Sequence, residues 1–160
     1  MRVLPILVAA TMACSAATAL AAPAPHTFTA RITVTGTQGA PTSKGIPGAL
    51  AGRGRSPQFG KVLMNGKGYQ RQGPTGDLLD NLRGTLTFAS RGSVSFHLVG
   101  TERFTDNMMT VVQSGRFTIT GGSGAYAHAT GKGTMHASCP NDPNSASLSC
   151  QQTWKGTIRY

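Results

Sequence analysis

The sequence predicts an all-β protein, a single eight-stranded antiparallel β-barrel held by one disulfide bond. Apolar and polar residues alternate in about eight short segments, spaced roughly 8–15 residues apart. Glycine and serine turn signals separate these segments, and no stretch after His26 sustains a helical period. An antiparallel sandwich is the alternative, but a closed barrel leaves no unpaired strand edge. The interior of such a barrel is just wide enough for side chains or one small ligand.

Residues 1–21 are expected to be a signal peptide rather than part of the fold. Arg2 supplies a positive charge, an apolar segment follows, and Ala19-Leu20-Ala21 fits the cleavage rule, which places the cut near Ala21–Ala22. A retained membrane anchor is a weaker alternative, because Pro5 interrupts an apolar core shorter than the ~20 residues that a span needs. A lipoprotein at Cys14 is weaker too, since the usual aliphatic residue three positions earlier is absent. We therefore expect a secreted or periplasmic protein whose mature domain, residues 22–160, has no transmembrane segment.

The first half of this domain gives uneven strand signals. Residues 28–35 alternate and are rich in β-branched side chains, which predicts a strand. Residues 36–57 are rich in glycine and proline, which predicts a long loop with a short pairing segment near 49–51. Asn65-Gly66 is the strongest two-residue turn signal and predicts a hairpin over 61–69. Residues 75–82 are expected to form one helical turn or a polar loop.

The second half is clearer. Alternating strands are predicted over 85–88 and 94–98, around a reverse turn at 90–93. Further strands are predicted over 108–113 and 116–120, separated by Ser114-Gly115. The last two are predicted over 133–138 and 151–160.

The cysteines favour one disulfide. Removal of the signal peptide leaves Cys139 and Cys150, and an even number of cysteines in an exported chain favours pairing. The residues between them are turn formers and small polar residues, so the bridge is expected to close a hairpin or surface loop. A metal site is disfavoured because there is no second cysteine pair, and His97, His128 and His136 are irregularly spaced.

A glycine-rich segment over residues 117–134, FTITGGSGAYAHATGKGT, has the look of a nucleotide-binding loop. Gly122-x-Gly124-x-x-Ala127 matches a loose dinucleotide fingerprint, but that fingerprint needs a helix to follow it. Gly131 and Gly133 leave no room for such a helix, so nucleotide binding is disfavoured.

The same segment resembles the allene oxide cyclase and dirigent barrels, and still more closely small secreted bacterial proteins with an allene-oxide-cyclase-like barrel. In that family a strand ends in Gly-Gly-Thr-Gly, an aromatic and a small residue follow, and Gly-x-Gly opens the next strand. Ser123 stands here in place of the commoner threonine, and the match covers about 18 of the 160 residues.

The resemblance implies an eight-stranded antiparallel barrel that uses no metal or organic cofactor. The plant relatives are often oligomeric, so a homo-oligomer is one expectation, and they cyclise an unsaturated fatty-acid epoxide or guide the coupling of phenols. No catalytic residue of theirs can be assigned to a position here, because only the glycine corner matches. The corner itself is expected to be structural, with Tyr126 as a buried plug and glycines where side chains would clash or strain the backbone: Gly121, Gly122, Gly124, Gly131 and Gly133.

The charge is strongly basic and uneven. The chain has 15 Lys and Arg against 5 Asp and Glu, a net charge of +10, and no acid precedes Asp77. Such a field favours polyanions, although a well-dispersed basic protein is the simpler alternative. Few aromatic residues accompany the cations, which argues against specific nucleic-acid binding. The expected contacts to a polyanion are Arg53, Arg55, Lys61, Lys67 and Arg71.

The expected ligand cavity lies in the barrel, lined by Phe88, Phe96, Leu98 and Phe117. Both a small-apolar-ligand carrier and a cofactor-independent cyclase or coupling guide depend on a cavity among these residues. Asp77, Asp80, Glu102 and Asp106 are expected to be solvated loop acids, with Glu102 as the first catalytic acid to test. The sequence favours a non-catalytic binding protein over an enzyme.

Overall fold

A computed structural model describes residues 23–89, 91–105, 109–140 and 148–160. The predicted signal peptide, Asp106 and Met108 lie outside these residues. The described chain forms eight strands: β1 (His26–Gln38), β2 (Ile46–Ser56), β3 (Gly60–Gln72), β4 (Leu78–Phe88), β5 (Gly92–Phe104), β6 (Thr110–Gly124), β7 (Thr130–Pro140) and β8 (Leu148–Arg159). No helix in the described part of the chain is long and apolar enough to cross a membrane.

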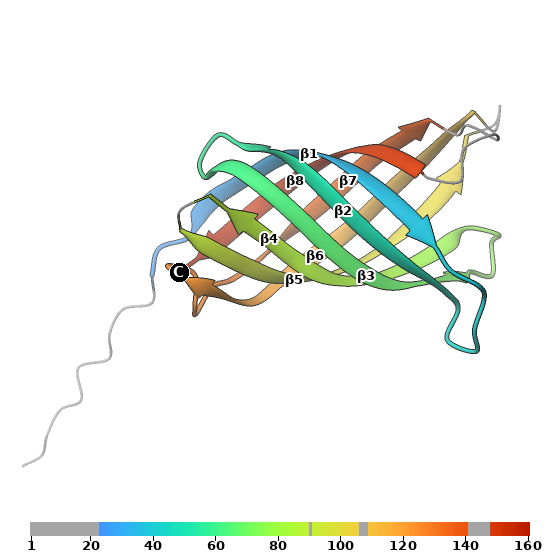
Figure 1. The fold of residues 1–160 in the computed structure, drawn as a ribbon, viewed down its shortest axis with the longest axis horizontal. Coiled ribbons are helices and arrows are strands. Elements are labelled where there is room, and N and C mark those ends of the chain that lie inside the picture. The colour runs from blue at the N-terminus through green and yellow to red at the C-terminus, as the bar shows by residue number, and fades with distance from the viewer. Residues whose placement is uncertain (1–22, 90, 106–108, 141–147) are drawn as a thin grey trace, which may run out of the picture.

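The eight strands form a closed barrel in chain order, as Figure 1 shows. Each strand pairs antiparallel with the next, and β1 pairs antiparallel with β8 to close the sheet. The predicted all-β class, antiparallel eight-stranded barrel and single disulfide are therefore confirmed.

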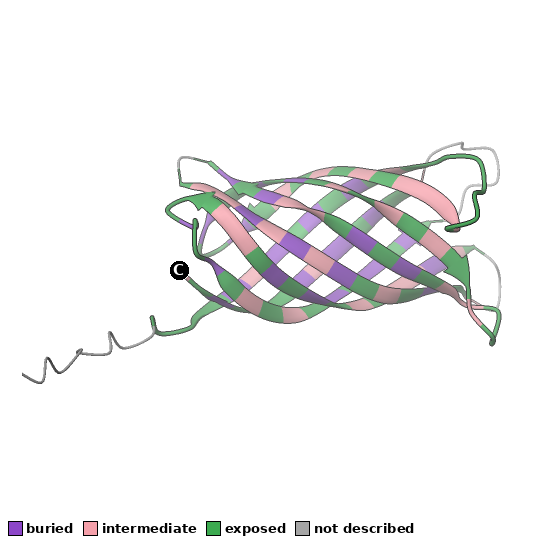
Figure 2. Cartoon of the chain, turned by 90° about the horizontal axis from the view of Figure 1, so that it is seen from below, coloured by how far each residue is buried: buried purple, intermediate pink, exposed green. Residues whose placement is uncertain are grey.

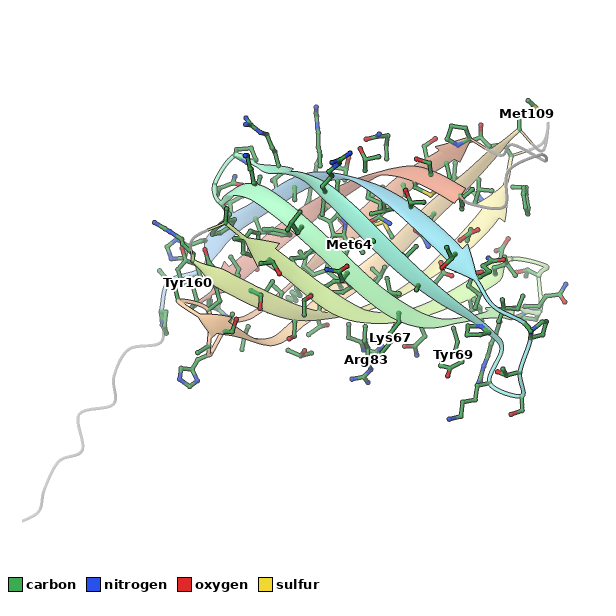
Figure 3. All side chains as sticks on the ribbon, in the orientation of Figure 1. Met64, Lys67, Tyr69, Arg83, Met109 and Tyr160 are labelled. Atoms are coloured by element: carbon green, nitrogen blue, oxygen red, sulfur yellow. A yellow bond between two sulfur atoms is a disulfide. The ribbon has the colours of Figure 1, made fainter. Side chains whose placement is uncertain are left out.

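Side chains alternate between the barrel interior and the outer wall, which is visible as alternating buried and exposed residues in Figure 2. The middle of the interior is filled around Trp154, whose ring centroid lies 5.0 Å from that of Phe96 and 4.9 Å from that of Phe117. Met64 and Met135, each at most 1% exposed, complete this layer. Figure 3 shows Met64 within the barrel outline.

The predicted loop over 36–57 is wrong, because β2 occupies most of it. Its glycines recur at every second position and so fall on one face, the interior. A Cβ added at Gly52 would lie 2.5 Å from Val34 Cγ1, and one added at Gly54 would lie 1.9 Å from the Arg31 carbonyl oxygen. Glycine here permits close approach of neighbouring strands instead of breaking the strand.

Three further predictions are wrong for related reasons. Asn65-Gly66 does not turn the chain, because β3 is continuous through it. Residues 78–82 belong to β4, not to a helical turn or loop, and Ser114-Gly115 lies within the single strand β6. The predicted strand over 85–88 is the second half of β4, so only β2 was missed as a strand, while β3 and β6 were each wrongly divided in two.

One end of the barrel is closed by aromatic side chains. The β2–β3, β4–β5 and β6–β7 connections meet at this end, together with the C-terminus (Figure 1). The Tyr126 ring is fully buried there, with centroids 5.3 Å from Phe88, 6.0 Å from Phe59 and 4.9 Å from Tyr160. We call this the closed end.

The glycine corner over residues 117–134 builds the closed end. Gly121 and Gly124 have φ angles of +144° and +61°, which side chains rarely adopt. Gly122, Gly131 and Gly133 have ordinary φ angles, but a Cβ at each would lie 2.1–2.3 Å from a backbone oxygen of a neighbouring strand. The segment thus ends β6, places Tyr126 under the barrel and starts β7.

The opposite end, called the open end, carries the disulfide. Cys139 near the end of β7 and Cys150 near the start of β8 are both buried and bonded to each other. The bridge ties these two strands together at the open end, where β7 ends and β8 begins.

Candidate functional site at the open end of the barrel

A cavity of about 350 Å³ occupies the open end, between the barrel wall and the filled middle layer. Its apolar lining comes from Val34, Leu50, Leu148 and Cys150 on β1, β2 and β8, and from Leu78, Leu82 and Val111 on β4 and β6. Its polar side comes from the four strands β3 to β6, each of which contributes one side chain: Gln70, Asp80, Glu102 and Gln113. Two carboxyl groups and two carboxamides therefore lie together on neighbouring strands, while apolar side chains line much of the rest of the cavity.

Two buried carboxyl groups dominate the polar side. Asp80 is 6% exposed and Glu102 is 7% exposed, and both occupy inward positions of their strands. Asp80 is opposite Gly100 and Glu102 is opposite Leu78 in the β4–β5 register, so the two acids are diagonal neighbours on the inner face. Side chains in such diagonal positions are close enough to interact.

Neutral carboxamides hold these carboxyl groups. Gln113 Nε2 donates a hydrogen bond of 2.5 Å to Asp80 Oδ2, and Gln70 Nε2 donates one of 2.9 Å to Glu102 Oε2. Gln38 Nε2 in turn donates to Gln70 Oε1 at 2.6 Å, which fixes the orientation of the Gln70 amide. The four strands β3 to β6 thus position one connected polar group.

Burial changes the acidity of both carboxyl groups. Burial raises the pKa of Glu102 to about 7; the nearby Asp80 adds to the rise and the hydrogen bond from Gln70 opposes it. Burial also raises the pKa of Asp80, against hydrogen bonds from Gln113 and Gln70. Glu102 therefore gains and loses its proton near neutral pH.

The floor of the cavity is rigid and polar. Gln152, only 2% exposed, accepts a 2.9 Å hydrogen bond through Oε1 from the indole Nε1 of Trp154. This bond satisfies the only polar atom of the tryptophan side chain and connects the cavity to the filled middle layer.

The predicted cavity lining is wrong. Phe88, Phe96, Leu98 and Phe117 all face the interior and are at most 2% exposed, but none of them lines the cavity. They pack with Trp154, Phe28 and the closed-end aromatic residues. A ligand or substrate held among these four side chains has no space, so the carrier and cyclase hypotheses fail in the form that the sequence suggested.

The prediction of solvated loop acids is also wrong for Asp80 and Glu102. Both lie on strands and point inward, whereas Asp77 lies in the β3–β4 connection, as expected of a loop acid, and is half-buried. Sequence reasoning singled out Glu102 but missed Asp80, Gln70, Gln113 and Gln152. The alternation of Leu78, Asp80 and Leu82 was the available signal, since it places the acid on the same face as two leucines.

The five predicted polyanion contacts do not form one patch. Arg55 lies directly opposite both Arg31 and Lys61, which gives a row of three exposed cations across β1, β2 and β3, with Arg53 two residues along β2. Lys67 instead faces Arg83 across β3 and β4, and Figure 3 shows both projecting away from the barrel. Arg71 donates through Nε to the Lys44 carbonyl oxygen at 2.6 Å, near the open end.

No group of three or more His, Cys, Asp or Glu residues in the described part of the chain is placed to hold a metal ion. Comparisons with protein-family models, curated proteins and solved structures give no match to this chain. The function is therefore inferred from the cavity and the surface.

Proposed function

We propose that this protein binds a small molecule in the open end of the barrel and is a binding protein rather than an enzyme. The observation that carries the proposal is the cavity of about 350 Å³, which combines apolar side chains with a cluster of polar ones on β3 to β6. Ligand sites in proteins are typically concave, about 300–1,000 Å³, mostly apolar and equipped with a few converging polar groups. The expected ligand is small, with an apolar part against β1, β2 and β8 and a polar group facing Asp80 and Glu102.

The inner polar groups support this proposal because the fold does not need them. The closed half of the same barrel is filled mainly by apolar and aromatic side chains and holds no buried carboxyl group among the described residues, whereas carboxyl groups are rarely buried without a partner. Their placement in the open half costs stability, and such a cost is typical of functional sites.

Mass spectrometry of small molecules released from the purified native protein tests the proposal. Leu148→Trp should fill the cavity and abolish ligand recovery, because Leu148 lines it at the rim. Leu63→Trp is the matched control, since Leu63 is 55% exposed on the outer wall. Equal recovery of the same compound from both variants would show that the cavity is not the binding site.

A cofactor-independent cyclase or coupling guide is the second candidate, in line with the resemblance of residues 117–134 to the allene-oxide-cyclase-like family. The observation that favours it is the pKa of Glu102, about 7, which suits a proton donor or acceptor at neutral pH. Incubation with an unsaturated fatty-acid epoxide, or with a phenol and an oxidant, should give altered product stereochemistry that Glu102→Gln abolishes. Unchanged product ratios with both substrates reject this candidate.

Contact with a polyanion is a third candidate, supported by the row Arg31–Arg55–Lys61. Like charges directly opposite each other destabilise a sheet, and an anionic partner would relieve that repulsion. Salt elution from immobilised heparin measures the contact. Replacing these three residues by serine should lower the elution salt more than replacing Arg116, Lys132 and Lys155, which removes the same charge from β6, β7 and β8. An equal shift would mean that only net charge matters.

We also propose export, on the signal-peptide pattern of residues 1–21 and the disulfide, which is the kind of bond that oxidising compartments maintain. Amino-terminal sequencing of protein recovered outside the cytoplasm should begin at Ala22. Recovery of an uncleaved chain would contradict the cleavage.

A further inference from the structure

The described cations and the described strand acids of this barrel lie on opposite faces of its wall. Every lysine and arginine in the described part of the chain is exposed, whereas the two described strand acids, Asp80 and Glu102, face the interior. Among the described residues that line the cavity there is no lysine or arginine. The two carboxyl groups therefore have carboxamide donors but no counter-charge.

This arrangement is incomplete as a structural ion site. A buried carboxylate is normally matched by a cation or by several hydrogen-bond donors, because its desolvation is expensive. Here the donors are neutral amides: Gln113 donates to Asp80 Oδ2, Gln70 donates to Glu102 Oε2, and Gln70 also hydrogen-bonds Asp80. The remaining oxygens, Asp80 Oδ1 and Glu102 Oε1, belong to side chains that line the cavity.

We propose that the ligand of the open end is a small amphiphile with a cationic ammonium head, which lies against Asp80 and Glu102. Its hydrocarbon part packs on Val34, Leu50 and Leu148. This inference rests on the binding proposed above and specifies the chemical class of the ligand.

The other head groups fit the cavity less well. A carboxylate or phosphate head would meet the negative charge of Asp80 or Glu102 without any cation to offset it. A neutral hydroxyl can exchange hydrogen bonds with the glutamine amides, but it leaves the carboxylate charge uncompensated. An ammonium group donates up to three hydrogen bonds and supplies the missing positive charge.

Binding of a cation is linked to proton release from the carboxyl pair. The groups that face Glu102 are Asp80 from β4, Gln70 from β3 and Gln113 from β6, and Tyr69 is the only other titratable side chain among the described lining residues. A cation favours the ionised carboxylate, so affinity should increase with pH and level off once Glu102 is ionised in the free protein.

Three probes of equal length separate the head groups: n-octylamine, which is cationic, n-octanol, which is neutral, and octanoate, which is anionic. Calorimetric titration of the mature protein at neutral pH should show octylamine binding at least 10-fold tighter than either of the others. The affinity for octylamine should rise between pH 5.5 and 8, while the affinity for octanol stays constant.

The double variant Asp80→Asn/Glu102→Gln preserves the size of both side chains and should lower octylamine affinity at least 10-fold with little effect on octanol. Asp77→Asn is the control, because it removes an acid from the open end outside the cavity and should change neither affinity. Thermal melting checks that each variant is folded. If the double variant does not fold, either single variant, Asp80→Asn or Glu102→Gln, replaces it in the same experiment.

Equal binding of octanol and octylamine would contradict the proposal that the ligand is cationic. An undiminished preference for the amine in the folded Asp80→Asn/Glu102→Gln variant would contradict it as well. Either result leaves the proposal of small-molecule binding in place. If none of the three probes binds, the cationic ligand is also overturned. Ligand recovery from the native protein, with Leu148→Trp as its blocked form, then decides separately whether the cavity binds any other molecule.

Discussion

The chemistry of Glu102 follows from its position within a strand. Leu98, Gly100 and Glu102 alternate with outward residues on β5, so the carboxyl group must point into the barrel. Arg103, one residue later, is exposed on the outer wall. A shift of one residue would exchange the buried acid for a buried base.

Burial of Glu102 should make stability fall as the pH rises. The unfolded chain loses this proton near the ordinary pKa of 4.5, whereas the folded protein keeps it until about pH 7. Between these values the folded state binds more protons than the unfolded state, so the free energy of unfolding decreases with pH. Glu102→Gln should match the wild type near pH 4.5 and exceed it by about 1–2 kcal/mol above pH 7, after allowance for screening.

Urea unfolding from pH 4.5 to 8 measures this difference, with Asp77→Asn as the control for loss of a half-buried acid outside the cavity. Parallel curves for the wild type and Glu102→Gln would show that the Glu102 pKa is not raised in the folded state.

Tyr126 differs from Glu102, because its polar atom is buried but makes no hydrogen bond within the described part of the chain. Its Oη atom is buried and has no hydrogen-bond partner in the described part of the chain. Burial raises the pKa of the phenol, and the nearby Arg91 partly offsets the rise. The ring, not the hydroxyl, should carry the stabilisation at the closed end.

Tyr126→Phe should therefore leave the free energy of unfolding unchanged or raise it by up to ~1 kcal/mol, because an unsatisfied hydroxyl is removed. Tyr126→Ala should cost about 3–5 kcal/mol, because the ring is lost from a packed aromatic cluster. Chemical denaturation compares the two. A loss above ~1 kcal/mol in Tyr126→Phe would reveal a hydrogen bond to the hydroxyl.

At the scale of the strands, the packing of β2 against β1 requires glycine, because there is no space for a Cβ atom at two of its inward positions. Gly52 and Gly54 bring β1 and β2 together at distances that no Cβ allows. Close approach of β1 and β2 leaves room in the interior for the large rings of Phe96, Phe117 and Trp154 from β5, β6 and β8. The glycines of β2 are thus part of how the core is filled.

Gly54→Ala should destabilise the barrel by about 1–3 kcal/mol, since the new methyl group meets backbone rather than a movable side chain. Ala51→Ser, on the outer face of the same strand, is the control and should stay within about 0.5 kcal/mol of the wild type. Thermal and urea unfolding give both values. A neutral Gly54→Ala would mean that β1 and β2 can separate without cost.

These strands also show what the sequence can predict. β1, β5, β7 and β8 alternate apolar or small residues with polar ones, and their positions were recognised. β2 was missed because period-two glycine resembles a loop in composition, and the first half of β4 was missed because Asp77 and Asp80 suggested solvent. A local sequence pattern predicts that side chains alternate along a strand, but it does not predict which residues of distant strands meet across the barrel interior.

The candidate site was predictable only in part. Glu102 and a location inside the barrel were inferred, yet the partners of Glu102 come from strands separated by many residues. Gln70 and Gln113 carry no local signal, since a glutamine on a strand is ordinarily a surface residue. Only the register of β3 to β6 brings them to the two acids.

The barrel as a whole is divided into a filled half and a hollow half. Aromatic packing secures the closed end, while the open end relies on hydrogen-bonded side chains and the Cys139–Cys150 bridge. The closed half should therefore supply most of the stability and the open half most of the binding specificity.

Loss of the disulfide should lower the free energy of unfolding by about 2–3 kcal/mol, the value typical of a short closed loop. The double variant Cys139→Ala/Cys150→Ala and the reduced wild type should agree in urea unfolding, and the spectroscopic signature of Trp154 should persist in both. A native-like stability without the bridge would show that strand pairing alone holds the open end.

The position of the two chain ends has a practical consequence. His26 pairs with Ile158 and its ring stacks on Tyr160 at 4.8 Å, so both ends of the described barrel lie beside each other at the closed end, away from the cavity (Figure 1). A fusion partner or a linker to a solid support, attached at either end, would leave the entrance unobstructed. The barrel is in this respect oriented for use as an immobilised sensor, with its anchoring points and its receptor face at opposite poles.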